Sequence, residues 1–363
     1  MKHNYKIQSL LIYILFLLIL FSSCKKDNNV NKPVAAKPVS LGLIQFGSSN
    51  GKRIFLPISK IGTQNISYYG VFDTGSSGMT MDANGILPAS MITSSGITVA
   101  GDSVVVNGIT VTSQQAIINF GDKLSSTKEY GNLAYASITI GDASGNLVLK
   151  RIPFFLYYKI VDGNGTALPA HSSDVFGVGP GMSYANSSIV SPLSFYSPGT
   201  GLTNGFRLTL LNSSNFSSTG ISTAALLNIG LTAADLSSSA FVMHPLTFYS
   251  TGGYSPNIPA TITYNGTSTA ALVLFDTGSP AITLIEDPKA TAGIGSLPAN
   301  SIVKVVTNQG FTYQYITTST SNLTSIQNPN NTGDYRTIFS IDFFVKNEFL
   351  TDYTNHKIGL KNN

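Results

Sequence analysis

Short apolar runs separated by polar turns make up most of this chain. Two such runs lie at residues 68–72 and 271–275, and each ends at a polar turn that contains glycine. Residues 104–111 form another, interrupted by Asn107-Gly108, a strong signal for a β-hairpin. No long stretch keeps the period of an amphipathic helix. The pattern predicts a protein built mainly from antiparallel β-sheet.

The amino-terminal segment has a different pattern. Lys2 and Lys6 precede an unbroken apolar run over residues 10–21, which is too short to span a bilayer comfortably. Leu20-Phe21-Ser22-Ser23-Cys24 then resembles a bacterial lipoprotein signal, in which the cysteine receives the lipid and becomes the mature amino terminus. We therefore expect a signal peptide over residues 1–23 and lipid attachment at Cys24. An ordinary secretory signal followed by an incidental cysteine is the alternative.

Residues 24–40 are rich in Lys, Asn and Pro and poor in apolar side chains, which predicts a flexible tether. A tether of about 17 residues is too short for an independently folded inhibitory segment. Cys24 is the single cysteine of the chain, so no intramolecular disulfide can form. The expected location is the cell envelope, with the protein lipid-anchored in the outer membrane and facing the periplasm or the surface.

Composition limits the partners that we expect. The chain of 363 residues is long enough for two lobes with their own cores. Its formal net charge of +4 includes Lys2 and Lys6 of the leader, which leaves the mature chain little field to attract nucleic acid. The four histidines are scattered without the spacing of metal ligands. We expect no nucleic acid, no metal and no other cofactor.

One string, Phe-Asp-Thr-Gly-Ser, occurs twice, at residues 72–76 and 275–279. A single copy of a specified pentapeptide is expected at about 10⁻⁴ in a chain of this length, so a duplicated functional half is the simplest explanation. Each copy follows a β-prone run, which places Asp73 and Asp276 where a buried strand enters a loop. Such a position can hold a carboxylate rigidly and expose it to a cleft.

Two carboxyl groups within hydrogen-bond range share one proton, because like charges at that distance raise one pKa. The ionised group can take a proton from an attacking water, and the protonated group can donate to the carbonyl oxygen. Glycines in these loops let backbone N–H groups approach the carboxylates, and hydroxyls can fix the loop geometry. The supporting residues are Thr74, Gly75, Ser76, Thr277, Gly278 and Ser279.

Simpler interpretations stand beside these motifs. A single Asp-Thr-Gly-Ser is commonly a β-turn, and only the pairing favours catalysis. The glycine-rich residues 177–181 lack the lysine and the helix start of a phosphate loop, so a turn is favoured there. Residues 171–174, His-Ser-Ser-Asp, contain the residue types of a catalytic triad, but adjacent residues rarely converge as a triad does.

At this point the chain resembles the pepsin-like aspartic proteases. The resemblance rests on the two aspartate loops, on a flap hairpin at residues 118–122 with its return strand at 131–135, on the segment 174–179 that threads beside the first loop, and on carboxy-terminal strands at 342–345, 352–353 and 357–360. It implies an all-β, bilobal fold of two related β-barrel-like lobes with a cleft between them. We expect an N-terminal lobe over residues 41–240 and a C-terminal lobe over residues 241–363.

The resemblance also implies roles for single residues. Asp73 and Asp276 would be the catalytic dyad, the two threonines would bond across the lobe interface, and the two serines would brace the outer carboxylate oxygens. The flap residues would be Phe120, Gly121 and Tyr130, with Phe120 where the family usually has tyrosine.

Together these features predict a monomeric aspartic endopeptidase that acts on peptides or unfolded protein and meets the membrane only through its lipid. The alternative is a catalytically silent module that binds peptide or glycan at the envelope. Phe120 motivates that alternative, as does Ser340, which replaces the glycine of the second apolar-apolar-Gly segment.

Overall fold

The computed structural model describes residues 36–48, 51–121, 126–142, 145–237, 239, 241–290 and 295–363. The chain divides into the units Met1–Ala36 and Lys37–Asn363, and everything below concerns the second. The predicted signal peptide, Cys24 and most of the tether lie outside the described residues. Among those described, no helix has the length and apolar character needed to cross a membrane.

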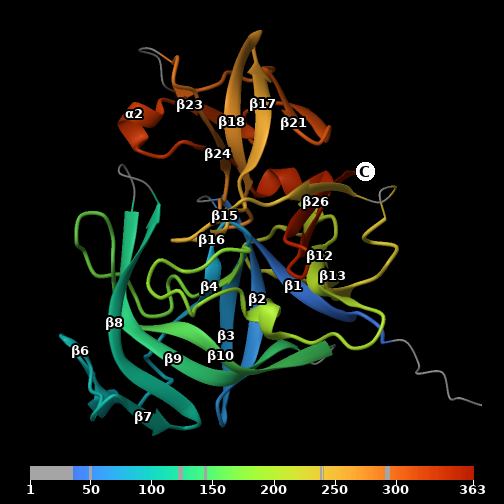
Figure 1. The fold of residues 1–363 in the computed structure, drawn as a ribbon. Coiled ribbons are helices and arrows are strands. Elements are labelled where there is room, and N and C mark those ends of the chain that lie inside the picture. Colours follow the sequence, from blue (N-terminus) through green and yellow to red (C-terminus); the bar gives the residue numbers. More distant parts are fainter. Residues whose placement is uncertain are drawn as a thin grey trace, which may run out of the picture. The chain divides into compact units, whose positions relative to one another are not determined.

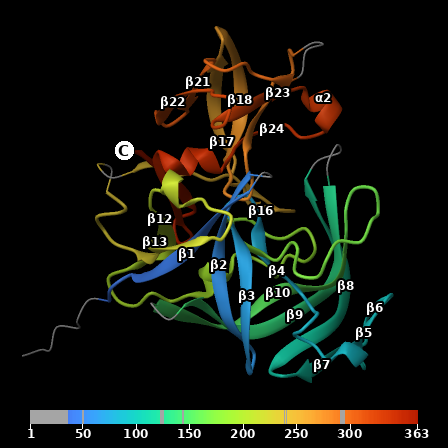
Figure 2. The ribbon, with the colours of Figure 1, turned by 180° about the vertical axis from the view of Figure 1, so that it is seen from behind.

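Nearly all regular structure in this unit is β-strand, in agreement with the predicted all-β class. Fourteen strands form the larger sheet. Figures 1 and 2 show it from opposite sides. Their spatial order is β14 (Val242–Pro245), β26 (Lys357–Asn362), β25 (Asn347–Asp352), β12 (Thr203–Leu208), β13 (Ile221–Leu231), β1 (Val39–Ser48), β2 (Gly51–Ile61), β3 (Gln64–Asp73), β11 (Val175–Val178), β4 (Ser77–Asp82), β10 (Gly145–Val161), β9 (Ser126–Asp142), β8 (Ile109–Gly121) and β7 (Ser103–Val106).

Eight strands form a second sheet, coloured orange to red in Figure 1. Their spatial order is β20 (Gly295–Ser296), β23 (Leu323–Gln327), β19 (Ile282–Glu286), β24 (Arg336–Phe339), β18 (Thr267–Phe275), β17 (Ile258–Tyr264), β21 (Ile302–Thr307) and β22 (Thr312–Ile316). Two hairpins stand apart, β5 (Ile92–Thr93) with β6 (Gly96–Ile97) and β15 (Phe248–Tyr249) with β16 (Gly253–Tyr254). Among the described residues the helices are one short α-helix, α2 (Pro329–Thr332), and four 3₁₀ segments: η1 (Ala89–Met91), η2 (Pro192–Phe195), η3 (Ser213–Asn215) and η4 (Ile341–Val345).

The sequence pattern explains the strands directly. In β21 and β22 buried and exposed residues alternate one by one, which is the pleat of a sheet with one face against the core. In β10 six consecutive residues, 152–157, are buried, because that strand is covered on both faces. The predicted hairpin at Asn107-Gly108 is confirmed, with Val106 paired to Ile109 and both turn residues at positive φ.

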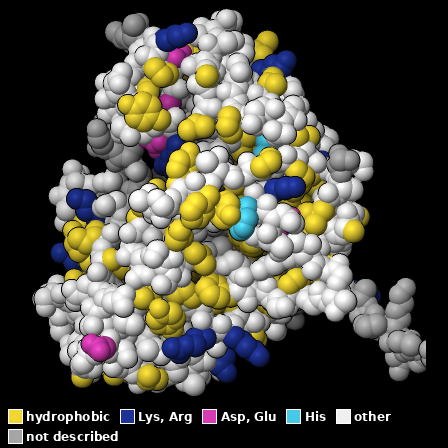
Figure 3. Space-filling model, viewed as in Figure 1, with side chains coloured by type: hydrophobic (Ala, Val, Ile, Leu, Met, Phe, Trp, Pro, Cys, Tyr) yellow, Lys and Arg dark blue, Asp and Glu magenta, His cyan; other side chains and the backbone are white. Residues whose placement is uncertain are grey.

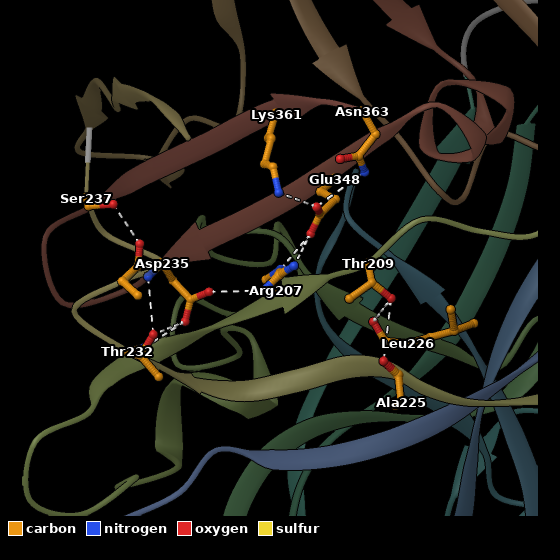
Figure 4. A network of polar contacts seen from close by, with 11 residues as sticks. Arg207, Thr209, Ala225, Leu226, Thr232, Asp235, Ser237, Glu348, Lys361 and Asn363 are labelled. Carbon is orange, nitrogen blue, oxygen red and sulfur yellow. Dashed lines mark hydrogen bonds and ion pairs between the residues drawn. The ribbon is translucent and has the colours of Figure 1, made fainter. Parts of the chain in front are cut away.

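The larger sheet takes strands from both sides of residue 240. β14, β25 and β26 come late in the chain but pair beside β12 and β13. A polar network fastens them (Figure 4): Glu348 on β25 accepts from Arg207 Nε at 2.6 Å and from Lys361 Nζ at 2.7 Å. Arg207 also reaches Asp235 Oδ1 at 3.2 Å. The carboxy terminus is thereby tied to the sheet that carries the first aspartate loop.

One predicted strand is wrong. Residues 342–345 belong to the 3₁₀ helix η4, which begins after Ser340. Residues of other elements hold its first turn in place, since Asp342 binds Lys52 Nζ and accepts from Asn322 N at 2.7 Å. The side chain of Asn347 donates to the carbonyl of Phe343 at 2.9 Å and closes the other end. These long-range contacts favour the turn over an extended segment.

The two aspartate loops lie at the ends of equivalent strands. β3 carries Asp73 and pairs in parallel with β11, which pairs in antiparallel with β4. β18 ends at Phe275, just before Asp276, and pairs in parallel with β24, which pairs in antiparallel with β19. The internal repeat of the sequence therefore corresponds to a repeated three-strand arrangement.

Candidate active site

The first aspartate is held by three donors from its own loop. Asp73 Oδ1 accepts from the backbone N–H groups of Gly75 at 2.7 Å and Ser76 at 3.2 Å. Asp73 Oδ2 accepts from the Ser76 hydroxyl at 2.6 Å. Asp73 is 8% exposed, so these donors replace solvation that the carboxylate has lost. The arrangement suits a negative charge on Asp73.

The second aspartate has fewer donors. Asp276 Oδ1 accepts from Gly278 N at 2.7 Å. Within the part of the chain that the structure describes, the Ser279 hydroxyl makes no hydrogen bond to Asp276, unlike the expectation for both serines. Ser279 instead contributes through its backbone, donating to the carbonyl of Asp276 at 3.3 Å and accepting from Ile341 N at 3.0 Å.

The two loops are joined by a symmetric pair of threonine contacts. Thr74 N donates to Thr277 Oγ1 and Thr277 N donates to Thr74 Oγ1, both at 3.0 Å. Each hydroxyl then donates to the carbonyl that precedes the opposite aspartate, Thr74 to Phe275 at 2.8 Å and Thr277 to Phe72 at 2.6 Å. Both threonines are buried, which makes these bonds costly to lose. These bonds fix the position of the two loops relative to each other.

Each loop glycine lies against the aspartate of the other loop. A Cβ on Gly75 would stand 2.5 Å from Asp276 Oδ1, and a Cβ on Gly278 would stand 2.6 Å from Asp73 Oδ1. No side chain fits at either place, so glycine is required by close approach rather than by backbone conformation. The absence of side chains lets the two carboxyls meet.

The electrostatics of the pair are unequal. Burial raises the pKa of Asp276 well above its usual value, and the charge of Asp73 and a hydrogen bond with it raise it further. The N–H of Gly278 and the charge of Arg53 oppose this rise in the pKa. A hydrogen bond between two carboxyls requires a proton on one of them. Asp73 receives three donors from its own loop and Asp276 receives one, which favours the proton on Asp276.

Packing beside the two loops also differs. Gly177 on β11 lies opposite Asp73, and a Cβ there would stand 2.6 Å from the carbonyl oxygen of Gly78. The equivalent position after β24 is Ser340, which is fully buried. Its N–H donates to Thr283 Oγ1 at 3.3 Å and its hydroxyl to the carbonyl of Ala281 at 3.4 Å. The second loop therefore has room for a side chain where the first has none.

The predicted flap forms the end of the β8–β9 hairpin, with Phe120 paired to Thr127 and Gly121 at a φ of +95°. The Phe120 side chain is half-buried and packs on a cluster of its own lobe that includes Leu133 and Phe155. Residues 122–125 at the turn lie outside the described residues. In Figure 3 the surface is hollowed at the left between the upper and lower parts, and side chains of both charges lie there.

Tyr130, the other predicted flap aromatic, lies on β9 opposite Ile117. Its ring faces the ammonium group of Lys159 at 5.2 Å. This cation–π contact lies within one lobe, and no hydrogen bond among the described residues joins Tyr130 to either aspartate.

The structure also reveals two charged residues that the motifs did not indicate. Arg53 on β2 interacts electrostatically with Asp73 and Asp276. Glu129 on β9 lies beside Asp174 and Asp82 instead, is fully buried, accepts from Thr80 Oγ1 at 3.4 Å, and has its pKa raised well above the usual range by burial. A charged residue at a buried strand position was the available signal for both.

Two residues of the triad-like string 171–174, His171 and Asp174, contact each other in a buried polar cluster whose role is structural. His171 Nδ1 and Asp174 Oδ2 are 2.7 Å apart, and Asp174 Oδ1 accepts from the Tyr157 hydroxyl at 2.8 Å and from Asp82 N at 2.9 Å. Tyr68 stacks on the His171 ring at 4.0 Å. These contacts hold the end of β4 to the segment that leads into β11.

Comparison with known proteins supports the fold at low sequence identity. No protein-family model matches the sequence, and no curated protein matches it. A crystal structure of aspartic proteinase from Irpex lacteus matches with a TM-score of 0.52 and 15% identity, over 90% of this chain and 97% of that one. Crystal structures of basic 7S globulin from soybean and of conglutin gamma, a basic 7S globulin from lupine seeds, each match with a TM-score of 0.54 and 12% identity, over 90% of this chain and 96% of theirs.

The matching structures therefore include one protein named as a proteinase and two named as globulins. Nearly the full length of each matches the described chain, and identity is too low to carry more than the fold. The paired aspartate loops, the parallel strands beside them and this likeness agree with one another. The chain has the bilobal, all-β fold of the pepsin-like aspartic proteinases.

Proposed function

We propose that this protein is an aspartic endopeptidase. The observation that carries the proposal is the reciprocal contact of the loops, in which each aspartate lies against the glycine of the other loop and the carboxyls interact. The surrounding hydrogen bonds favour a charge on Asp73 and a proton on Asp276. A dyad in this state contains one base and one acid.

The chemistry follows from that asymmetry. Asp73 takes a proton from a water molecule as the water oxygen attacks the peptide carbonyl carbon, and Asp276 gives its proton to the carbonyl oxygen. The resulting diol loses a hydroxyl proton to Asp276 while Asp73 gives its newly acquired proton to the amide nitrogen, and the C–N bond breaks. An amine and a carboxylic acid leave, and no cofactor takes part. A dyad that must share one proton predicts a rate maximum below neutral pH.

The test is digestion of a reduced, unfolded protein by the full chain in detergent, across pH, beside Asp73→Asn and Asp276→Asn. Each substitution keeps the shape and removes an acid–base group, so kcat/KM should fall by about 10³-fold or more. A far-ultraviolet circular dichroism spectrum checks that each variant is folded. If wild type and variants release peptides at the same rate, the proposal is lost.

A second function is a silent module that binds peptide or glycan at the envelope. Phe120 favours it, because the side chain packs within its own lobe and brings no hydroxyl to the cleft. Two of the matching structures are also named as globulins. This function predicts that a statine-type peptide, which imitates the tetrahedral intermediate, binds wild type and dyad variants equally. Under the endopeptidase proposal it binds wild type much more tightly.

We propose further that the protein is a monomer anchored in the cell envelope through a lipid on Cys24. The charged start, the apolar run and the small residues before Cys24 support this. Incorporation of a labelled fatty acid into wild type, and its loss in Cys24→Ser, would be the expected result. Equal labelling of both proteins would contradict the anchor.

A further inference from the structure

Arg53 stands on the strand next to the first aspartate loop. β2 pairs in antiparallel with β3, with Phe55 opposite Val71 and Leu56 opposite Gly70. Continued by two residues, this register places Arg53 opposite Asp73, and residues opposite one another in a sheet point to the same face. The electrostatic interaction of Arg53 with both aspartates agrees with this placement.

The Arg53 guanidinium feels the charges of Asp73 and Asp276 but is bonded to neither in the described chain. Among the described residues no ion pair or side-chain hydrogen bond involves it, and Nη1 is enclosed without a partner. The residue as a whole is half-buried, and Nε and Nη2 are not among the enclosed atoms that lack a partner. Burial lowers the pKa of Arg53, and the charges of Asp276 and Asp73 offset that loss of water only in part.

The neighbouring cations, unlike Arg53, form ion pairs with carboxylates of the chain. Lys52, the preceding residue, pairs with Asp342. Arg336, which also interacts with Asp276, is bound to Asp334 through Nε at 2.9 Å and Nη2 at 2.7 Å. Arg53 and Arg336 thus both interact with Asp276, and of these two only Arg336 forms an ion pair with a carboxylate among the described residues. Arg53 faces two carboxyls that are already engaged with each other and with their own loops.

We propose that Arg53 binds a carboxylate of the peptide held in the cleft, so that the site selects substrates with an acidic group close to the scissile bond. The inference rests on the proposed function of the cleft. A guanidinium offers planar, paired donors that match a carboxylate. An extended peptide rises about 3.3 Å per residue, so a group near the dyad lies within about three residues of the bond. The carboxylate belongs either to an Asp or Glu side chain or to the peptide's own carboxy terminus.

The test uses peptide pairs that differ only in Glu or Gln at one position within three residues of the bond, each with a free or an amidated carboxy terminus. The full chain in detergent should cut the best Glu peptide about 10- to 100-fold faster in kcat/KM than its Gln partner, the usual strength of a charge-assisted hydrogen bond. A side-chain carboxylate predicts this ratio with either terminus. A terminal carboxylate predicts instead a loss on amidation.

Two variants and a control assign the preference to Arg53. In Arg53→Met the Glu to Gln ratio should fall to about 1, and Arg53→Lys should keep part of it because the charge remains. Arg336→Met is the matched control, since that cation is already paired, and should keep the wild-type ratio. The ratio within one protein is insensitive to any general loss of activity. A variant that slows the Glu and Gln peptides equally would show that Arg53 only adjusts the dyad, which overturns the proposal.

A binding measurement separates this inference from the proposed catalysis. Statine-containing peptides with Glu or Gln at the same position are titrated into wild type and Arg53→Met, with affinity read by fluorescence anisotropy. Tighter binding of the Glu peptide to wild type alone supports the Arg53 site even if no peptide is cut. The statine peptides are also compared with a free and an amidated carboxy terminus. Equal binding of all four peptides to wild type overturns the inference even if the dyad is active.

Discussion

The two aspartate loops share five residues in sequence but differ in their surroundings. Their inner contacts are symmetric, since Thr74 and Thr277 exchange equivalent hydrogen bonds. Their outer contacts are not, because Ser76 binds Asp73 at 2.6 Å while no such bond from Ser279 to Asp276 occurs among the described residues. The repeat therefore builds a symmetric frame around a pair of carboxyls in unequal states.

The cause of the difference lies in residues far from the loops in sequence. Gly177 lets the first loop close tightly over its neighbour strand, whereas Ser340 occupies the equivalent place beside the second. Arg53 adds a cation from β2. An identical motif thus acquires different chemistry from the strands that pack on it. Four predictions test this view.

The largest expected effect concerns the symmetric frame. Thr74→Val and Thr277→Val each leave a buried N–H and a buried carbonyl without their partner, and a buried unpaired group costs about 1–3 kcal/mol. Each variant should lose about 2–4 kcal/mol in the free energy of unfolding, measured by urea denaturation, and the two losses should agree. A difference above about 1 kcal/mol would mean that the frame is not symmetric.

The next effect separates the packing of the two loops. Gly177→Ala places a methyl group against the backbone of Gly78, and overpacking of this kind costs about 1–3 kcal/mol. Ser340→Ala removes only a 3.4 Å hydrogen bond and should cost less than about 1 kcal/mol. Thermal unfolding of both variants provides the measurement. Equal shifts in Tm would show that the two loops do not differ in how tightly they are packed at these positions.

A smaller effect concerns catalysis. Ser76→Ala removes a donor to Asp73, which is the base in the mechanism that we propose, so kcat/KM should fall by about 10-fold. Ser279→Ala is the matched variant and should change kcat/KM by less than about 2-fold. Both are measured with one peptide at the optimal pH. A reversed order would exchange the roles that we assign to the two aspartates.

The smallest effect is on the dependence of stability on pH. The pKa of Asp276 is raised in the folded state, so its contribution to stability is complete below the unfolded pKa of about 3.9 and is lost as pH rises through the folded value. Glu129, whose pKa burial also raises, acts with the same sign. Unfolding free energy should therefore decline less from about pH 4 to pH 8 in Asp276→Asn, and least in Asp276→Asn/Glu129→Gln. An unchanged decline would contradict the protonated state of Asp276.

Much of the fold was predictable because short segments of the sequence determine it. Short apolar runs that end at polar turns indicated the strands, and Asn107-Gly108 indicated a hairpin that the structure contains. The segment at residues 342–345 was not predictable as a helix, because its turn depends on Lys52 and Asn322, which are distant in sequence. Local propensity is a weak guide where long-range polar contacts decide the backbone.

The sequence by itself determined that two aspartates stand in equivalent loops, since a repeated string at the ends of β-prone runs can be read without coordinates. Only the tertiary structure decided that the two carboxyls have unequal surroundings, with three loop donors to Asp73 and one to Asp276. Those surroundings combine burial, the loop donors Ser76 and Gly278, and the charge of Arg53 on a neighbouring strand. Electrostatic energy varies with distance and burial, and neither quantity is contained in a motif.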